Sequence, residues 1–386
     1  MRKNKLGQII GFEFIFRIAL HIDDIEVLKY IQKTLNCGTI QLDRNTYVLK
    51  ISKLEDIESI LFQIFDLFPL NTKKHLDYLD FKKAYFMYVN RKNLNKQVVF
   101  ADIAEIKNSM NDQRTIFNLP ENHVINITGN YLVGLLEGDG SFYLSKQHMV
   151  PRVSLITITL DKLLLFAIRD FLLNQLDSHS KLLGTETKLI NITDKKQIGN
   201  NKPISILEIY QIDYICNILI PYLDNFEFKT KKYLDYLDFR TIAFLIYDGK
   251  HLLENGEELI LKLADSMNNS RLSTSSDKFT IDSKTKYALG ELIKSAPLIS
   301  VNSEGRAMII KELKYIRSTY IIQAVLPNGS ISYFINDAQC AKYFKVSNST
   351  IGRRLNDGKP ILKNNEISVL MLKRIRAYSP HSSPSI

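Results

Sequence analysis

The sequence predicts an α+β fold made of two tandem repeats, and three observations lead to that prediction. Runs with period-two alternation, which suit strands with one buried face, follow one another along the chain with segments of helical spacing between them. Residues 72–81 recur as residues 230–239 with a single difference, His75 against Tyr233. Residues 109–114 reappear in similar form as residues 266–271, so the two matches keep offsets of 158 and 157 residues. A match held in register over such a length indicates duplicated domains related by pseudo-twofold symmetry.

Composition restricts the class of protein. The 386 residues suffice for two or three domains, and a net charge of +10 favours an anionic partner. The 36 Lys among 51 basic residues, with 19 Tyr, 20 Phe and no Trp, are typical of an AT-rich coding sequence and point to an organelle, which we take to be the mitochondrion. No import or signal peptide is convincing, and no apolar run approaches the roughly 18 residues of a membrane span. The three cysteines are scattered singly, so neither a disulfide framework nor a zinc site is expected.

The first repeat reads as strand, helix, hairpin and helix. Residues 12–22 alternate as a strand whose polar face carries Arg17 and His21, which suits contact with nucleic acid or with water alone. A helix is expected at 23–35, a hairpin at 38–51 with its turn at 43–45, and a second helix at about 54–67.

The second repeat has the same order of elements. A strand is expected at 151–160, a helix near 161–173, a hairpin across 181–210 and a helix at about 211–222. The tip of this hairpin carries Lys195 and Lys196, which are able to reach phosphates or base edges. An ordinary solvated loop is the alternative for each residue.

Residues 132–140 introduce the second repeat with a helix that ends in an acid. Gly134 and Gly138, four residues apart, leave that helix without side chains where another helix would pack closely. Asp139 follows at the foot of the helix, and Gly140 allows a sharp turn into the next strand. This stretch resembles the signature of the LAGLIDADG homing endonucleases, with Val133, Glu137 and Gly138 as mild departures from it.

The resemblance implies a fold and an activity. Two αββαββα-like repeats would form a pseudo-twofold saddle over double-stranded DNA, with the motif helices packed through Gly134 and Gly138. Asp139 would bind the divalent metal, Mg²⁺, that cleaves DNA. A lysine near the scissile phosphate is also typical of the family, and spacing places it at Lys231 in the second repeat and Lys73 in the first, with Lys232 and Lys74 as second choices. For each lysine taken alone, a solvated helix start is an equally good interpretation.

The first repeat lacks a comparable motif helix, because the chain enters the strand at Phe12 almost at once. We therefore expect this repeat to be truncated at its N-terminus and Asp139 to supply half of a metal site. The other half would come from an upstream coding segment joined in frame, or the nuclease would be impaired.

The C-terminal segment reads as a basic helix-turn-helix. Residues 341–376 contain nine Lys or Arg against two acids, a net charge of +7. The pattern is similar to the small DNA-binding modules appended to homing nucleases, in which the second helix enters the groove. Five side chains are then candidates for DNA contact: Asn348, Ser349, Thr350, Arg353 and Arg354. A small basic helical cap on the second repeat is the alternative.

These expectations divide the chain and assign it a function. The units are a first repeat (1–111), a linker (112–126), a second repeat (127–275), a linker (276–319), a basic module (320–378) and a tail (379–386). The leading hypothesis is an intron-encoded, Mg²⁺-dependent, site-specific DNA endonuclease acting as a pseudo-dimeric monomer without a membrane partner. An RNA maturase that binds its host intron RNA, and a non-catalytic DNA-binding regulator, are the alternatives.

Overall fold

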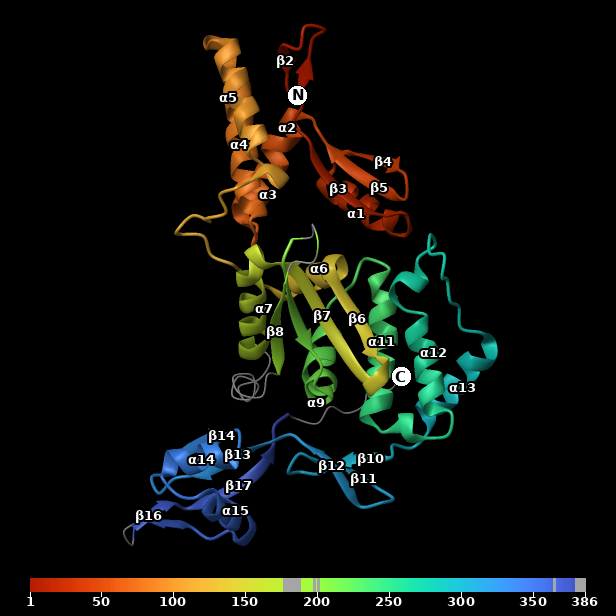
Figure 1. Cartoon of the computed structure of the whole chain (residues 1–386), viewed down its shortest axis with the longest axis vertical. Helices are drawn as coiled ribbons and strands as arrows, with labels where there is room; N and C mark the ends of the chain where they lie inside the picture. The colour runs from red at the N-terminus through yellow and green to blue at the C-terminus, as the bar shows by residue number, and fades with distance from the viewer. Residues whose placement is uncertain (176–188, 197–198, 200–201, 364–365, 379–386) are drawn as a thin grey trace.

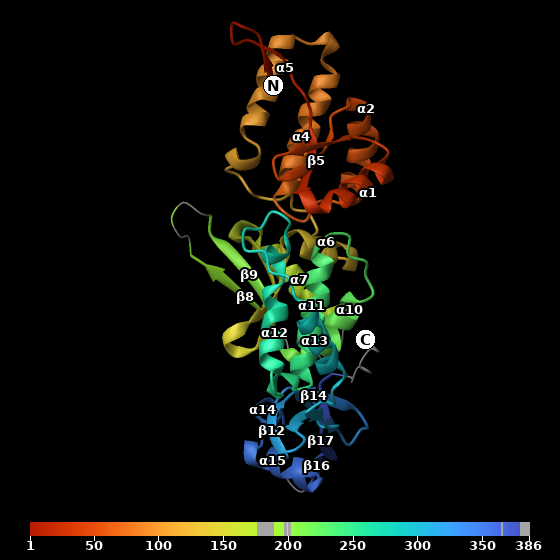
Figure 2. The same ribbon diagram turned by 90° about the vertical axis from the view of Figure 1, so that its right-hand side faces the viewer.

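The computed structural model describes residues 1–175, 189–196, 199, 202–363 and 366–378. Helices and antiparallel sheets are mixed throughout, as expected for an α+β protein. The first repeat, the second repeat and the C-terminal module follow one another along the long axis of the molecule (Figures 1 and 2). In the described part of the chain, no helix has the length and apolar character needed to cross a membrane.

The first repeat has a three-stranded antiparallel sheet in the order β3-β5-β4. The hairpin turns at residues 44 and 45, where Arg44 has a φ of 56°. The helices predicted at 23–35 and 54–67 are confirmed, and the second is one continuous helical stretch with a π-helical middle. The elements are β1 (Arg2–Lys3), β2 (Ile9–Gly11), β3 (Phe16–His21), α1 (Ile25–Leu35), β4 (Thr39–Asp43), β5 (Thr46–Ile51), α2 (Leu54–Asp56), η2 (Ile57–Leu61), α3 (Phe62–Leu67), α4 (Lys74–Val89) and α5 (Lys96–Asn108).

The second repeat has a four-stranded antiparallel sheet in the order β6-β7-β9-β8. Helix α7 packs on β7 and β9, and α11 packs on β6 and β7. The elements predicted at 151–160, 161–173 and 211–222 are confirmed; the hairpin predicted across 181–210 is confirmed over 190–209, and residues 181–188 lie outside the described part. The elements are α6 (Gly129–Asp139), β6 (Gly140–Ser145), β7 (Val150–Ile158), α7 (Lys162–Gln175), β8 (Ile190–Lys195), β9 (Ile204–Ile209), α9 (Ile212–Tyr214), η7 (Ile215–Leu219), α10 (Ile220–Leu223), α11 (Lys232–Tyr247) and α12 (Gly256–Asp265).

The two sheets differ by one strand. By position and order, β3, β5 and β4 correspond to β7, β9 and β8, whereas α6 and β6 have no counterpart within described residues 1–15. The strand predicted over 12–22 begins only at Phe16. Phe12 and Phe14 are nevertheless buried, because they pack on helices in an extended segment that has no strand partner there. The centre of the Phe14 ring lies 5.5 Å from the centre of the Phe81 ring. In the second repeat, the Phe142 ring of β6 lies 5.3 Å, centre to centre, from the equivalent Phe239 ring. The period-two pattern at Phe12 and Phe14 therefore reflects burial of these side chains and not pairing in a strand.

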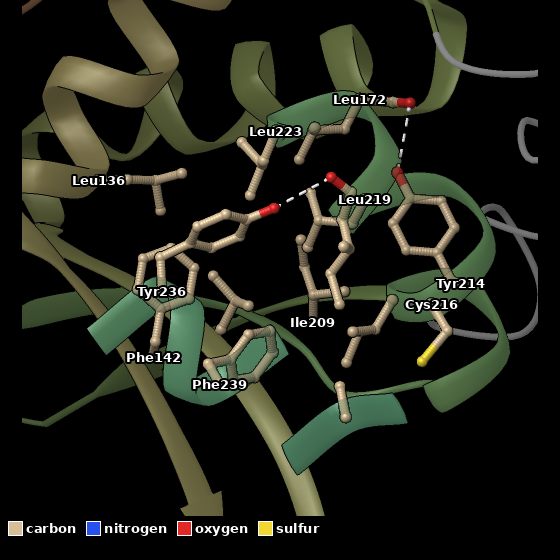
Figure 3. Packing of buried hydrophobic residues seen from close by; sticks show 14 of the residues in the cluster. Leu136, Phe142, Leu172, Ile209, Tyr214, Cys216, Leu219, Leu223, Tyr236 and Phe239 are labelled. Atoms are coloured by element: carbon tan, nitrogen blue, oxygen red, sulfur yellow. Dashed lines mark hydrogen bonds between the residues drawn. The ribbon is translucent and has the colours of Figure 1, made fainter. Parts of the chain in front are cut away.

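The largest core lies in the second repeat, between its sheet and helices α7, α9, α10 and α11. Figure 3 shows the rings of Phe142, Tyr236 and Phe239 packed below Leu136 of α6. The Tyr236 hydroxyl lies 2.6 Å from Asp224 Oδ1 and 3.1 Å from the backbone carbonyl of Ile220, so its single proton has an acceptor inside the core. This core fixes α6, and with it the motif residues.

Residues 276–319, expected to be a linker, instead contain a helix and a small sheet. These are α13 (Ser283–Lys294) and the three-stranded sheet of β10 (Ile299–Val301), β11 (Arg306–Ile309) and β12 (Lys314–Ser318). The polar composition concealed α13, whose buried apolar residues Leu289 and Leu292 are too few to give a strong periodic signal. By contrast, no helix or strand lies between residue 113 and α6.

The C-terminal module contains more strands than the sequence indicated. The two helices expected of a helix-turn-helix are present, and so is the turn at 326–330. A three-stranded sheet in the order β14-β13-β17 and a hairpin β15-β16 complete the module. The elements are β13 (Tyr320–Val325), β14 (Ile331–Phe334), α14 (Asp337–Phe344), α15 (Asn348–Asp357), β15 (Ile361–Lys363), β16 (Glu366–Val369) and β17 (Met371–Arg376).

Candidate functional site

Helix α6 delivers Asp139 to the boundary between the two repeats (Figure 1). Thr128 caps the helix by accepting a hydrogen bond from the Tyr131 N–H at 3.2 Å, and Leu132 and Leu136 anchor it in the core. Asp139 is the last residue of the helix and is exposed. Among the described residues, its carboxylate has no hydrogen-bond or ion-pair partner.

The surroundings of Asp139 suit a hard cation. The carboxylate lies in a cavity of about 160 Å³, together with Thr72, Thr157 and Asp161. Burial raises the pKa of Tyr131, and the negative charges of Asp161 and Asp139 add to that rise. A helix C-terminus also favours positive charge. Within the described residues, no group of three or more acidic, His or Cys side chains converges on one point. Mg²⁺ often takes only one or two protein carboxylates and completes its shell with phosphate and water, so one exposed carboxylate here fits such an ion.

The glycine face of α6 is open. A Cβ built on Gly134 or Gly138 meets no atom within 4 Å. Both glycines line a cavity of about 790 Å³ whose opposite wall includes Ile18 and Leu20 of β3. The helix contact expected at these glycines is therefore not made by the part of the chain that the structure describes, where no second motif helix exists to approach them.

The two repeats contact each other through matched hydrogen bonds. The backbone N–H of Lys231, at the start of α11, donates to Asp24 Oδ1 at 2.7 Å. The backbone N–H of Lys73, at the start of α4, donates to Asp161 Oδ1 at 2.9 Å. Asp24 and Asp161 each lie at the start of a helix that packs on the sheet of their own repeat. In each case this acid caps the lysine-bearing helix of the other repeat. This reciprocal contact depends on tertiary structure and has no signature in the sequence.

The two candidate lysines have different environments. The Lys231 ammonium lies 2.6 Å from Asp23 Oδ2, and its side chain is 29% exposed. Burial alone would raise the pKa of Asp23, but hydrogen bonds from Lys231 and Ser273 hold it well below its usual range. The Lys73 ammonium instead lies 5.3 Å from the centre of the Phe117 ring. The structure thus gives Lys231 a carboxylate partner across the repeat boundary.

Glu137, treated in the sequence analysis only as a mild departure, joins two elements of the second repeat. Its Oε1 accepts hydrogen bonds from the backbone N–H groups of Lys229 at 2.6 Å and Thr230 at 2.5 Å. The side chain therefore ties α6 to the start of α11, the helix that Lys231 begins. A carboxylate can satisfy several otherwise unpaired N–H groups at a helix start, which explains an acid here.

The repeated sequence elements form a clasp in each repeat. In the second repeat, Asp235 Oδ1 accepts from the Asn268 N–H at 2.8 Å and from Arg271 Nε at 2.9 Å, and Arg271 also pairs with Asp238. Asp235 is 4% exposed. The clasp fixes α11 to the turn that follows α12.

The first repeat contains the same clasp, made by the equivalent residues. Asp77 Oδ1 accepts from the Asn111 N–H at 2.9 Å and from Arg114 Nε at 3.0 Å, and Arg114 also pairs with Asp80. The duplicated motifs are therefore explained by structure, and Lys73 and Lys231 lie beside them at the helix starts.

Of the residues expected on the nucleic-acid face, Arg17, Lys195 and Lys196 are exposed. Arg17 pairs loosely with Asp43 at 3.4 Å, where both side chains are more than half exposed. Lys195 alternates along β8 with Asp194, whose exposed carboxylate accepts hydrogen bonds from Lys162 and Ser205.

His21 differs from that expectation. Its side chain is 21% exposed, Nε2 lies 2.7 Å from the Thr274 hydroxyl, and Nδ1 accepts from the Asp23 N–H at 3.2 Å. The imidazole therefore lies in the contact between the repeats, because β3 ends there. The period-two pattern placed His21 on the correct face but gave no sign that the second repeat covers it.

Helix α15 uses part of its polar surface for its own cap. The Ser347 hydroxyl accepts from the Thr350 N–H at 3.1 Å and lies 2.8 Å from the hydroxyls of both Ser349 and Thr350. Arg354 pairs with Asp357 at 2.6 Å. The exposed candidates on this helix are Asn348, Ser349 and Arg353.

Comparison with known proteins places these features in context. A model of the family described as LAGLIDADG endonuclease matches residues 1–85 and 132–243, about half of the chain and parts of both repeats. The uncharacterized mitochondrial protein RF1 of Saccharomyces cerevisiae is 24% identical over 93% of this chain and 78% of its own length. The probable intron-encoded endonuclease Cox1-I1b of Schizosaccharomyces pombe is 31% identical over 41% of each chain. The probable intron-encoded endonuclease 2 of Neurospora crassa is 24% identical over 65% of this chain. This chain spans less than two thirds of both named endonucleases, 41% and 57%.

Solved structures show the same fold. Meganuclease I-SmaMI bound to uncleaveable DNA superposes with a TM-score of 0.57 at 22% identity, over 69% of this chain and 92% of its own. Homing endonuclease I-GzeII in complex with its DNA target gives a TM-score of 0.54 at 24% identity, over 66% and 88%. The fold, the motif helix ending in Asp139 and the family match across both repeats agree. This chain belongs to the LAGLIDADG endonuclease family.

Proposed function

We propose that this chain is a site-specific double-strand DNA endonuclease, encoded in a mitochondrial intron and acting as a monomer whose two repeats form a saddle over one target. Support comes from the family and from relatives named as mitochondrial or intron-encoded proteins. The net charge of +10 suits a polyanion. The like order of strands in the two repeats suits a target whose halves resemble each other.

The exposed, unpaired carboxylate of Asp139 carries the catalytic part of the proposal. Helix α6 holds it at the boundary of the repeats, where a phosphate on a bound duplex would approach it. We assign Asp139 as a ligand of Mg²⁺, a choice that agrees with the use of divalent metals by this family and with an I-SmaMI structure solved with calcium ions. When bound there, Mg²⁺ supplies electrostatic stabilisation of charge that develops on the phosphate during hydrolysis.

The remaining residues bind and orient the duplex. Arg17, Lys195 and Lys196 are exposed cations that contact phosphates or base edges in this proposal. Lys231 and Lys73 stand at the N-caps of α11 and α4 and offset phosphate charge in this proposal. Asp23 occupies one side of the Lys231 ammonium, so a phosphate that binds Lys231 shares it with Asp23 or displaces Asp23. Glu137 positions the start of α11 and hence Lys231.

Asp139→Asn tests the assignment. The substitution keeps the size of the side chain and removes the charge that holds the cation. We expect cleavage of a selected duplex with Mg²⁺ to fall by about 100-fold or more, whereas binding in Ca²⁺ changes by less than about threefold. Asp170→Asn is the control, since Asp170 is 61% exposed on α7 and pairs only with the adjacent Arg169 among the described residues.

Parallel loss of binding and cleavage in Asp139→Asn would refute a metal-ligand role. Assays of the unsubstituted chain distinguish the endonuclease from the maturase and the regulator. Stimulated splicing of its host intron RNA without Mg²⁺-dependent cutting would favour the maturase, and specific DNA binding without either activity would favour the regulator.

A further inference from the structure

Strand β13 is shared between two hydrophobic cores. Its neighbouring residues Ile321 and Ile322 are both 0% exposed. Ile322 packs in the core of the C-terminal module, with Ile351 of α15 among its members. Ile321 belongs to the core of the second repeat, together with Tyr378, which is 2% exposed. Successive side chains of a strand point to opposite faces, so this one strand joins the module to the repeat. Separating the two would expose both faces of the joint to water.

A buried polar network fixes the orientation at this joint. Asp213 of α9 is 8% exposed, and its Oδ2 accepts from Arg317 Nε at 3.1 Å and from the Thr319 hydroxyl at 2.9 Å. Arg376 of β17 donates to the Tyr247 hydroxyl at 2.7 Å. Charge-assisted hydrogen bonds are directional, and leaving Asp213 buried without partners would be costly. The network therefore opposes rotation of the module as well as its departure.

The chain between the repeat and the module is also attached to the second repeat near its middle. The backbone N–H groups of Leu298 and Ile299 both donate to the Asp248 carbonyl, at 2.8 and 3.1 Å. Lys250, 6% exposed, donates from Nζ to the Ile293 carbonyl at 2.7 Å. These bonds hold residues 293–299 to the turn that follows α11.

The outer surface of the module offers a reading face. Ser349, Arg353 and Asn356 are exposed on α15 at spacings of four and three residues, so they share one side of the helix. Ser347 caps the N-terminus of α15, and residues 341–376, which include the helix, carry nine Lys or Arg against two acids. Polar side chains on one side of a short, capped, basic helix match the geometry of a major-groove reader.

We infer that the C-terminal module reads a second segment of the same DNA target, at one fixed number of base pairs and one helical phase from the segment under the repeats. The inference rests on the proposed function, because it concerns how a DNA target is recognised. Its physical basis is the shared core and the Asp213 network, which make the module and the second repeat one body. Arg317 is then a positioning residue for specificity, although it faces Asp213 and not the reading face of α15.

The test begins with duplexes selected from a random library by the full-length chain. We expect two conserved blocks at a single spacing. Inserting 5 bp between the blocks turns the outer block by about half a helical turn and should weaken binding by at least about tenfold. Inserting 10 bp restores the phase but not the distance, so it should weaken binding similarly. Arg353→Ala should lose preference for the outer block alone.

Variants at the joint separate rigidity from simple tethering. Arg317→Met removes one bond to Asp213, and Asp213→Asn weakens both; because Ile321 stays in the shared core, either variant should relieve only part of the binding penalty that the 5-bp insert imposes on the parent chain. Lys314→Met is the matched control on the same strand, since Lys314 is exposed, and it should keep the spacing requirement. Far-UV circular dichroism checks that each variant is folded.

The possible outcomes have distinct meanings. If the parent chain selects two blocks but tolerates changes in their spacing, the fixed-spacing inference is wrong. It is also wrong if the chain selects a single block and Arg353→Ala leaves that selection unchanged. Both of those results would leave the endonuclease proposal standing. Failure to select any duplex would refute the proposed function together with this inference.

Discussion

The clasp made by the duplicated motifs gives the most direct test of the structural reasoning. Asp235→Asn keeps the shape of the side chain and one acceptor oxygen but removes the negative charge that faces Arg271. Asp235 is 4% exposed and accepts two hydrogen bonds. Breaking a buried ion pair outright costs about 3–5 kcal/mol. Because Asp238 still neutralises Arg271 and the Asn268 N–H keeps an acceptor, we expect a loss of about 2–3 kcal/mol.

Urea denaturation followed by far-UV circular dichroism measures this loss in free energy of unfolding. Asp77→Asn should cost a similar amount, since Asp77 accepts equivalent bonds from Asn111 and Arg114. Asp265→Asn is the control: Asp265 pairs with Lys146 at the surface, where both side chains are about half exposed, and its loss should stay within about 0.5 kcal/mol. A loss below about 0.5 kcal/mol in Asp235→Asn would refute the clasp as the reason for the repeated motif.

Three further substitutions test other contacts. The pKa of Asp23 is held below its usual range, so Asp23 contributes stability that is present above its unfolded pKa of about 3.9 and is lost as the pH falls through the folded value. Asp23→Asn should therefore flatten the acid limb of a stability-against-pH curve. An unchanged limb would argue against the Lys231 contact. Phe142→Ala, in a fully buried position, should cost about 3–5 kcal/mol by urea denaturation, and a cost under 1 kcal/mol would contradict the packing in Figure 3. Gly249→Ala should lower the thermal midpoint, because φ is +77° and the new Cβ would lie 2.7 Å from Ile299 Cγ1; an unchanged midpoint would mean that this turn does not hold β10 in place.

Several features of the fold were predictable because their signals are local. Leu28 and the other apolar residues of α1 recur at helical spacing, so the pattern alone located that helix. The hairpin around Arg44 depends on neighbouring residues and was also predicted. The duplication was visible because two nearly identical motifs recur at almost the same offset, 158 and 157 residues, and the motif around Asp139 was sufficient to suggest the family.

Other features depend on which surfaces meet, and the sequence carries little information about that. Polarity suggested a linker at 276–319, but α13 is buried by its contact with α12, not by a strong pattern of its own. Alternation extended the first strand back to Phe12, yet a strand needs a partner, and none pairs with residues 12–15.

The sequence by itself determined the class of fold, the duplication, the position of Asp139 and the basic character of the C-terminal module. Only the tertiary structure decided that Lys231 faces Asp23, that His21 is covered, that the glycine face of α6 is open and that β13 belongs to two cores. The reason is physical. Periodicity, caps and turns follow from the conformational preferences of residues a few positions apart, whereas a contact between residues more than 200 positions apart, such as Asp23 with Lys231, depends on how whole elements pack.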